Sequence, residues 1–150
     1  MTVAVDALNI AYWCGVPPDL RLPLTLLAHL LERGQRALLF FDASARHKLT
    51  DDDRGLYDEL LTSAHVVQVP KGKHADGVIL KHARDTGGQI VSRDRFADHR
   101  RRFRKLIDDP ARILPGSVAQ DVLHVPALGV SARLFTSSRD AWASIRARGI

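Results

Sequence analysis

Short apolar runs alternate with segments of helical hydrophobic spacing along most of this chain. Four runs rich in apolar and β-branched residues predict buried strands at residues 2–5, 37–41, 65–69 and 89–91. Between them, the spacing of apolar residues predicts helices around residues 20–31, 51–61 and 75–83. Alternating strands and helices imply crossover connections, and so the pattern favours an α/β fold with a parallel sheet. The first strand is apolar on both faces, so we expect it at the centre of the sheet.

The pattern weakens after residue 91. The arginine-rich segment that follows predicts a helix ending near Asp108-Asp109-Pro110, and residues 122–125 predict a fifth strand. Ser137 or Ser138 is expected to cap a closing helix over residues 137–148. No internal repeat or linker divides the chain, so we expect a single domain over residues 1–150.

An aspartate follows each of the predicted strands at or soon after its end. These residues are Asp6, Asp42, Asp76 and Asp94. Because parallel strands end at the same edge of a sheet, their side chains are expected to converge there. If the chain is helical after Asp94, then Asp98 lies one turn further on the same face. Each acid alone can also be explained as a helix cap or as a partner of a helix dipole, but their repetition favours one shared site.

The net charge of the chain favours a polyanionic binding partner. The chain of 150 residues carries a formal net charge of +5, with a sequence pI of about 9.9, which favours a partner such as nucleic acid. Basic residues also gather near the acids in two clusters, which include Lys71, Lys73, His74, Arg93, Arg95, Arg100 and Arg101. Without the acids, a solvated surface explains these clusters equally well.

Several other classes of protein lack support in the sequence. There is no Gly-rich phosphate loop of the dinucleotide or P-loop type and no Gly-x-Ser-x-Gly turn. The single cysteine, Cys14, excludes an intramolecular disulfide and a thiolate-cluster zinc site, and we expect it to be buried. No apolar run approaches the ~20 residues of a membrane span, and the first residues do not resemble a signal peptide. A soluble, cytoplasmic protein without membrane association is therefore expected.

Clustered carboxylates in a basic protein indicate a hard divalent cation. Mg²⁺ and Mn²⁺ prefer oxygen ligands, and they keep waters and accept substrate phosphates as further ligands. Nearby arginine and lysine side chains would hold the polyanion. The residues therefore predict metal-assisted hydrolysis of a phosphodiester, in which a metal-activated water attacks phosphorus.

Four motifs carry a resemblance to a known family. They are Val5-Asp6-Ala7-Leu8-Asn9-Ile10-Ala11, Phe41-Asp42-Ala43-Ser44, the segment 70–80 around Lys73-His74-Ala75-Asp76-Gly77, and Val91-Ser92-Arg93-Asp94-Arg95-Phe96-Ala97-Asp98. In this order and spacing they resemble the NYN branch of the PIN-like ribonucleases, particularly the Regnase type, over roughly residues 2–130. The resemblance implies a PIN-like three-layer α/β/α sandwich with a central, mainly parallel sheet. It also implies an endoribonuclease that depends on Mg²⁺ or Mn²⁺ and has RNA as its partner.

The resemblance also assigns roles to single residues. It implies metal-holding acids at Asp6, Asp76, Asp94 and Asp98, and polar residues that orient ligands or water at Asn9 and Ser92. Asp42 is an additional candidate acid. The chain departs from the Regnase-type pattern in having Ala75-Asp76 in place of frequently paired acids, and Ser92-Arg93-Asp94 in place of Ser-Asn-Asp.

Three functional hypotheses follow. The first is a metal-dependent RNA endonuclease whose specificity comes from RNA shape, a protein partner or a homodimer. The second is an RNA-binding or scaffold protein that keeps the fold but does not cleave RNA. Metal-dependent cleavage that is lost in Asp6→Asn or Asp94→Asn would rule this hypothesis out. The third, by family analogy, is a growth-arresting nuclease toxin, whose toxicity on expression the same substitutions would cure.

Overall fold

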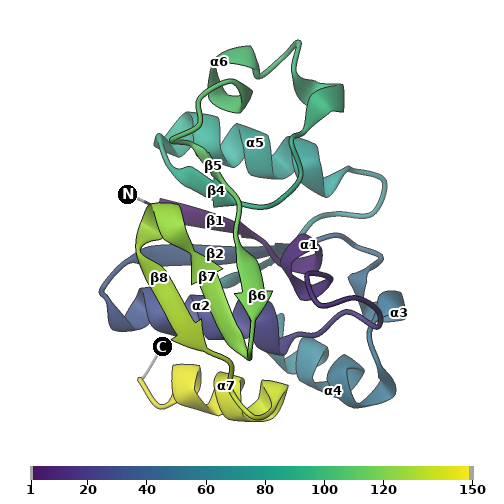
Figure 1. Cartoon of the computed structure of the whole chain (residues 1–150). Helices are drawn as coiled ribbons and strands as arrows, with labels where there is room; N and C mark the ends of the chain where they lie inside the picture. The colour runs from purple at the N-terminus through teal and green to yellow at the C-terminus, as the bar shows by residue number, and fades with distance from the viewer. Residues whose placement is uncertain (1, 149–150) are drawn as a thin grey trace.

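The computed structural model describes residues 2–148 and is built around one parallel sheet (Figure 1). This sheet has five strands in the order β3-β2-β1-β4-β5, and every neighbouring pair is parallel. The strands are β1 (Thr2–Asp6), β2 (Arg36–Phe41), β3 (Val66–Gln68), β4 (Gln89–Val91) and β5 (Ile113–Leu114). The expected α/β class, the parallel sheet and the central first strand are confirmed.

Helices cover both faces of this sheet, which confirms the expected three-layer sandwich (Figure 1). Alternation along β1 sends Val3 and Val5 into the larger core cluster and Ala4 into the smaller one on the opposite face. Helices α1, α2, α4 and α7 contribute to the larger cluster, and α5 and α6 contribute to the smaller one. The helices are α1 (Ala7–Ala11), α2 (Arg21–Glu32), α3 (Ala45–Lys48), α4 (Asp51–Leu60), α5 (Ala75–Thr86), α6 (Arg104–Ile107) and α7 (Ser138–Arg146).

Local chemistry explains where several helices begin and end. The Thr50 hydroxyl accepts a hydrogen bond from the Asp53 backbone N–H at the start of α4, and Ser137 does the same for Asp140 in α7. Helix α5 ends at Gly87, which has a left-handed backbone conformation. No helix within residues 2–148 combines the length and apolar character needed to cross a membrane. Cys14 is exposed in the turn after α1, so the expectation of a buried thiol is wrong.

Residues 122–125 form a strand, but they do not extend the parallel sheet. They are β7 (Val122–Val125), the middle strand of a second, antiparallel sheet with β6 (Ser117–Ala119) and β8 (Val130–Arg133), next to the short 3₁₀ helix η2 (Pro126–Leu128). Gln120 and Asp121 both have positive φ, as two-residue hairpin turns require, so the chain reverses before β7. The fifth parallel strand is β5, which the sequence pattern missed.

The arginine-rich segment is not the continuous helix that the sequence predicts. Phe96 has a left-handed backbone, and it is followed by the 3₁₀ helix η1 (Ala97–His99) and then by the short α6. Phe96 and Phe103 are both buried in the smaller core cluster, so tertiary packing overrides the helix propensity of the arginines between them. Asp94 and Asp98 are therefore not an i,i+4 pair on one helix.

Candidate active site

The order of the strands creates a crevice at one edge of the sheet. The chain runs from β1 outward to β2 and β3, and then returns to the other side of β1 to form β4. In parallel sheets, ligands bind outside the carboxyl ends of the strands at such a switch point. The last residue of β1 is Asp6, and β4 leads directly into Ser92-Arg93-Asp94.

Asp6 is a buried carboxyl group, with 8% of its surface exposed. The Ser92 hydroxyl donates a hydrogen bond to Asp6 Oδ2 at 2.8 Å. Burial raises the pKa of Asp6 to about 7; the Ser92 bond lowers it, while the charges of Asp76 and Asp94 raise it. Although α1 starts at the next residue, the Asp6 side chain makes no capping hydrogen bond. The structure thus gives Asp6 no role as a helix cap.

The turn after β4 holds Asp94 in place through its backbone. The Asp94 N–H donates to the Ser92 hydroxyl at 3.0 Å, and the Phe96 N–H donates to Asp94 Oδ1 at 2.8 Å. The Ser92 hydroxyl therefore connects the side chain of Asp6 to the backbone of Asp94. Asp94 Oδ2 receives no hydrogen bond within the described residues.

Asn9 links α1 to the turn after β4. Its Oδ1 accepts from the Trp13 indole Nε1 at 3.1 Å and from the Arg93 N–H at 3.0 Å. Two donors on one atom identify that atom as the oxygen of the amide. The amide nitrogen of Asn9 is therefore the group left for a ligand, and it suits a phosphate oxygen better than a cation.

Two further acids reach the same crevice from neighbouring elements. Asp76 lies in the first turn of α5, and burial followed by the charge of Asp94 raises its pKa, while the charges of His99 and His74 lower it. Asp42 follows β2 and behaves oppositely, because the Ser44 N–H and hydroxyl both donate to its Oδ1 at 2.8 Å. These two bonds lower the pKa of Asp42 and favour its charged form.

One cavity of about 240 Å³ brings these acids together. It is lined by Asp6, Leu8, Asn9, Tyr12, Asp42, Lys48, Ala75, Asp76 and Asp94. We call it the acid cavity. The structure therefore places the four strand-end aspartates around one space, as the sequence pattern predicts. Asp98 is not among the lining residues; it is exposed in η1, which begins after the left-handed residue Phe96.

The predicted RNA-binding residues fall into three groups. Arg93, Arg95 and Arg100 line a second, larger cavity next to the acid cavity. Lys71, Lys73 and His74 lie in the exposed turn before α5. Arg101 is exposed, whereas the Arg100 guanidinium is paired with Asp108, with Nε 3.0 Å from Oδ1. The structure thus brings only some of this basic set to the crevice.

The amino-acid sequence matches the family model of the Zc3h12a-like ribonuclease NYN domain over residues 1–128. The chain belongs to this family. Of the elements described above, β8 and α7 lie beyond the matched residues of the NYN domain. A comparison with curated proteins finds no match.

Solved structures show where else this fold occurs. The NYN domain is similar to Arabidopsis thaliana nuclear protein-only RNase P 2, with a TM-score of 0.64 and 16% identity over 83% of this chain and 29% of that chain. A second structure of nuclear proteinaceous RNase P 2 from A. thaliana gives a TM-score of 0.68 and 14% identity, over 90% and 31% of the two chains. This chain thus spans less than a third of the length of those proteins, and at these identities the likeness shows the fold alone.

The acid cavity of the NYN domain is lined by carboxylate oxygens, which are the type of ligand that Mg²⁺ and Mn²⁺ prefer. NYN and PIN-like nucleases generally depend on a divalent metal, and the carboxylates of Asp6, Asp76 and Asp94 are hard oxygen ligands. Within residues 2–148, however, no three His, Cys, Asp or Glu side chains are grouped closely enough to hold a metal ion. Mg²⁺ commonly takes only one or two carboxylates and completes its shell with water and phosphate, so this arrangement still fits it.

Sequence reasoning missed three residues near the acids of the NYN domain. Tyr12 and Lys48 line the acid cavity, and the positive charge of Lys48 helps to lower the pKa of Asp42. His99 lies close enough to Asp76 to lower its pKa, and its Cε1 is 3.8 Å from the position that a Cβ would take on Gly77. Lys48 and His99 belong to the short helices α3 and η1, for which the sequence gives no periodic signal.

Proposed function

We propose that this NYN domain is an endoribonuclease that depends on Mg²⁺ or Mn²⁺ and hydrolyses RNA phosphodiester bonds in the acid cavity. The observation that carries the proposal is the convergence of Asp6, Asp42, Asp76 and Asp94 at the switch point of the sheet. Membership of a ribonuclease family supports RNA as the substrate.

Asp6, Asp76 and Asp94 are the residues that would hold the cation. The charges of Asp76 and Asp94 raise the pKa of Asp6, and the charge of Asp94 raises the pKa of Asp76. A divalent ion bound among these carboxylates relieves this repulsion. A bound Mg²⁺ or Mn²⁺ supplies a water of lowered pKa and neutralises charge on the phosphate. Asp98 has no part in this proposal, because it does not line the acid cavity.

Other side chains of the acid cavity position these acids and meet the substrate. The Ser92 hydroxyl orients Asp6 and favours its ionised form. The Asn9 amide nitrogen and the Lys48 ammonium group are hydrogen-bond donors at the wall of the same cavity, where they suit phosphate oxygens. Because the pKa of Asp6 is about 7 without a cation, the charge of the site depends on pH in the neutral range.

The test is cleavage of a labelled single-stranded RNA by the purified protein with Mn²⁺, with Mg²⁺ or with EDTA. Asp94→Asn removes a carboxylate from the acid cavity. Asp52→Asn is the matched control, because Asp52 is exposed in the first turn of α4 and its substitution removes the same negative charge. We expect metal-dependent cleavage by the wild type and by Asp52→Asn, and none by Asp94→Asn. Equal cleavage by the two variants, or cleavage in EDTA, would contradict the proposal.

A second candidate function is RNA binding without turnover. The observation that favours it is that, across residues 2–148, the acids are not already grouped as a metal centre. In the same experiment this function predicts RNA binding by the wild type, the absence of cleavage with either metal, and no effect of Asp94→Asn beyond a change in affinity.

A further inference from the structure

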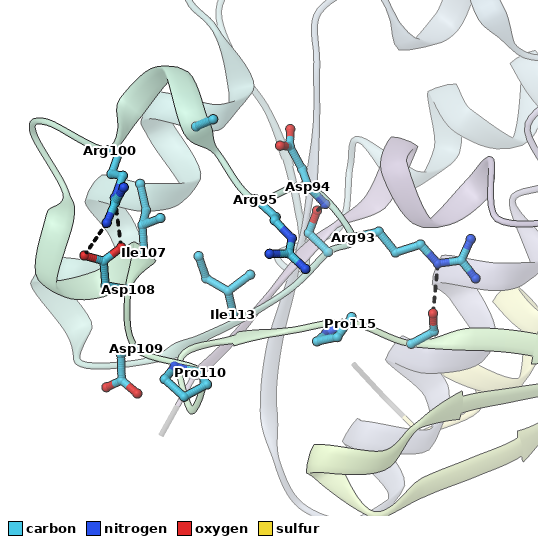
Figure 2. Close-up of a pocket in the computed structure, with 13 residues that line it drawn as sticks. Arg93, Asp94, Arg95, Arg100, Ile107, Asp108, Asp109, Pro110, Ile113 and Pro115 are labelled. Atoms are coloured by element: carbon cyan, nitrogen blue, oxygen red, sulfur yellow. Dashed lines mark hydrogen bonds and ion pairs between the residues drawn. The ribbon is translucent and has the colours of Figure 1, made fainter.

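A second cavity of about 790 Å³ adjoins the acid cavity, and Asp94 lines both (Figure 2). It lies between the turn after β4, the end of α6 and the strand β5 with the residues that follow it. Its volume falls in the range of about 300–1,000 Å³ that is typical of pockets for small molecules and cofactors. We call it the nucleotide cavity. It is large enough for a nucleotide and too small for a folded partner.

The charged side chains of the nucleotide cavity lie at its two ends. Figure 2 shows Arg93 and Arg95 at the end that contains Asp94, and Asp108 and Asp109 at the other end. Arg95 makes no ion pair within the described residues, whereas Asp108 is already paired with Arg100. Arg100 also lines the far end, where Asp108 pairs with it, so Arg93 and Arg95 are the cavity's arginines that stay available to attract a phosphate.

Arg93 is held in position before any ligand binds. Its Nε donates to the Gly116 carbonyl oxygen at 2.9 Å, and its guanidinium carbon lies 4.6 Å from the centre of the Trp13 ring. Its backbone N–H is held by Asn9, which lines the acid cavity. A side chain on Gly116 would collide with the Trp13 ring and with the His124 carbonyl oxygen, so only glycine allows this close packing beside Arg93. Arg93 is thus a preorganised cation between the two cavities.

Between the charged ends, the wall of the nucleotide cavity is apolar. Ile107, Pro110, Ile113 and Pro115 line it, and Figure 2 shows Arg95 extending toward Ile113. Ile107 and Ile113 are only partly buried, so the cavity leaves apolar surface in contact with water. A nucleobase offers an apolar face of matching character, and arginine guanidinium groups stack on such faces.

We propose that the nucleotide cavity binds one unpaired nucleotide next to the scissile phosphate, and that the domain thereby selects single-stranded RNA. The base lies against Ile113 beneath Arg95, and its phosphate lies at Arg93, where the acid cavity begins. Bases in a duplex stay stacked and paired, so a paired base has no access to this space. This inference rests on the proposed function, since it concerns a substrate of the same site.

The experiment measures binding in EDTA, so it does not depend on cleavage. The probe is a short single-stranded RNA with one 2-aminopurine, whose fluorescence reports transfer of that base from its stack to an apolar site, and the same RNA paired with its complement is the comparison. Arg95→Ala tests the cavity. Arg133→Ala is the matched control, since Arg133 is exposed in β8, makes no ion pair within the described residues and does not line the cavity.

A second pair of variants tests the space itself. Ala97 lines the nucleotide cavity and is exposed, so Ala97→Glu obstructs it without disturbing the core. Ala119→Glu is the control, because Ala119 is exposed in β6 and lies outside the cavity lining. We expect Arg95→Ala and Ala97→Glu to weaken binding of the single strand by about tenfold relative to their controls and to remove the fluorescence change.

Binding of the single strand and the duplex with equal affinity, or equal effects of Arg95→Ala and Arg133→Ala, would overturn the proposal, even if metal-dependent cleavage were found. Conversely, a base-specific signal lost in Arg95→Ala and Ala97→Glu supports the cavity even if no cleavage occurs. The two failures can thus be told apart.

Discussion

The acid cavity and the nucleotide cavity share Asp94 but are built in different ways. The acid cavity is framed by the ends of β1, β2 and β4 and by the first turn of α5, and hydrogen bonds hold Asp6, Asp42 and Asp94 in place. The nucleotide cavity is walled largely by irregular chain around η1 and α6 and by the edge strand β5. The comparison suggests a division of labour in which regular elements hold the groups for chemistry, and irregular segments hold the substrate.

The largest expected effect tests whether the acid cavity serves turnover and the nucleotide cavity serves substrate binding. Asp76→Asn should lower kcat by on the order of a thousandfold and leave RNA affinity in EDTA unchanged or stronger, because it removes a negative charge near the phosphate. Arg95→Ala should act mainly on KM. Steady-state kinetics on a single-stranded RNA checks both, and a loss of kcat in Arg95→Ala equal to that in Asp76→Asn would contradict the division.

Phe103 is one of the two buried aromatic side chains that anchor the irregular wall in the smaller core cluster. Phe103 is 3% exposed, and the guanidinium carbons of Arg84 and Arg102 each lie 5.2 Å from its ring centre. Phe103→Ala should lower the free energy of unfolding by about 3–5 kcal/mol, as expected for a buried aromatic residue. Phe135→Ala, at a partly exposed position, should cost clearly less. Urea denaturation measures both, and equal losses would mean that Phe103 is not an anchor.

In the acid cavity, by contrast, substitution of Asp6 should stabilise the fold at neutral pH, because the buried Asp6 carboxylate destabilises the native state there. Burial raises the pKa of Asp6 from 3.8 in the unfolded chain to about 7 in the folded protein. The native state therefore binds the extra proton between these values, and wild-type stability falls as pH rises through 7. Without metal, Asp6→Asn should equal the wild type near pH 4 and exceed it by about 2–4 kcal/mol at pH 8. An Asp6→Asn variant that is no more stable at pH 8 would contradict the buried charge.

The smallest expected effect concerns Ser92. Its hydroxyl donates to Asp6 and lowers the pKa of that carboxyl, so Ser92→Ala should shift the rise of cleavage with pH to higher pH. Loss of such an orienting hydrogen bond should reduce activity at pH 7 by about tenfold. Ser92→Thr keeps the hydroxyl and serves as the control. An unchanged pH profile in Ser92→Ala would show that the hydroxyl does not tune Asp6.

The sequence predicted the acid cavity well, because its signals are local and repeated. Strands that are apolar on both faces and end at Asp6, Asp42 and Asp94 require only the rule that parallel strands end at one edge. The acids therefore converge at this edge, and their convergence does not depend on which helices cover each face of the sheet. The roles of the acids in metal binding and catalysis stay predictions.

The wall of the nucleotide cavity could not be predicted in the same way. Arginines and leucines between residues 95 and 107 have high helix propensity, yet Phe96 and Phe103 are drawn into the smaller core cluster and break the helix. The broken helix also explains why Asp98 does not lie one helical turn after Asp94, as expected. The strand β5 has only two residues, which is too short for any periodic pattern.

Binding of Mn²⁺ to the metal-free protein tests the central claim most directly. Titration calorimetry should compare the wild type with Asp6→Asn, Asp94→Asn and the exposed control Asp52→Asn at a pH above the pKa of Asp6, which is about 7. The account predicts saturable binding to the wild type and the control, weakened by at least about tenfold in both cavity variants. Equal affinity in all four proteins, or no saturable binding to the wild type, would contradict a metal site formed by these acids.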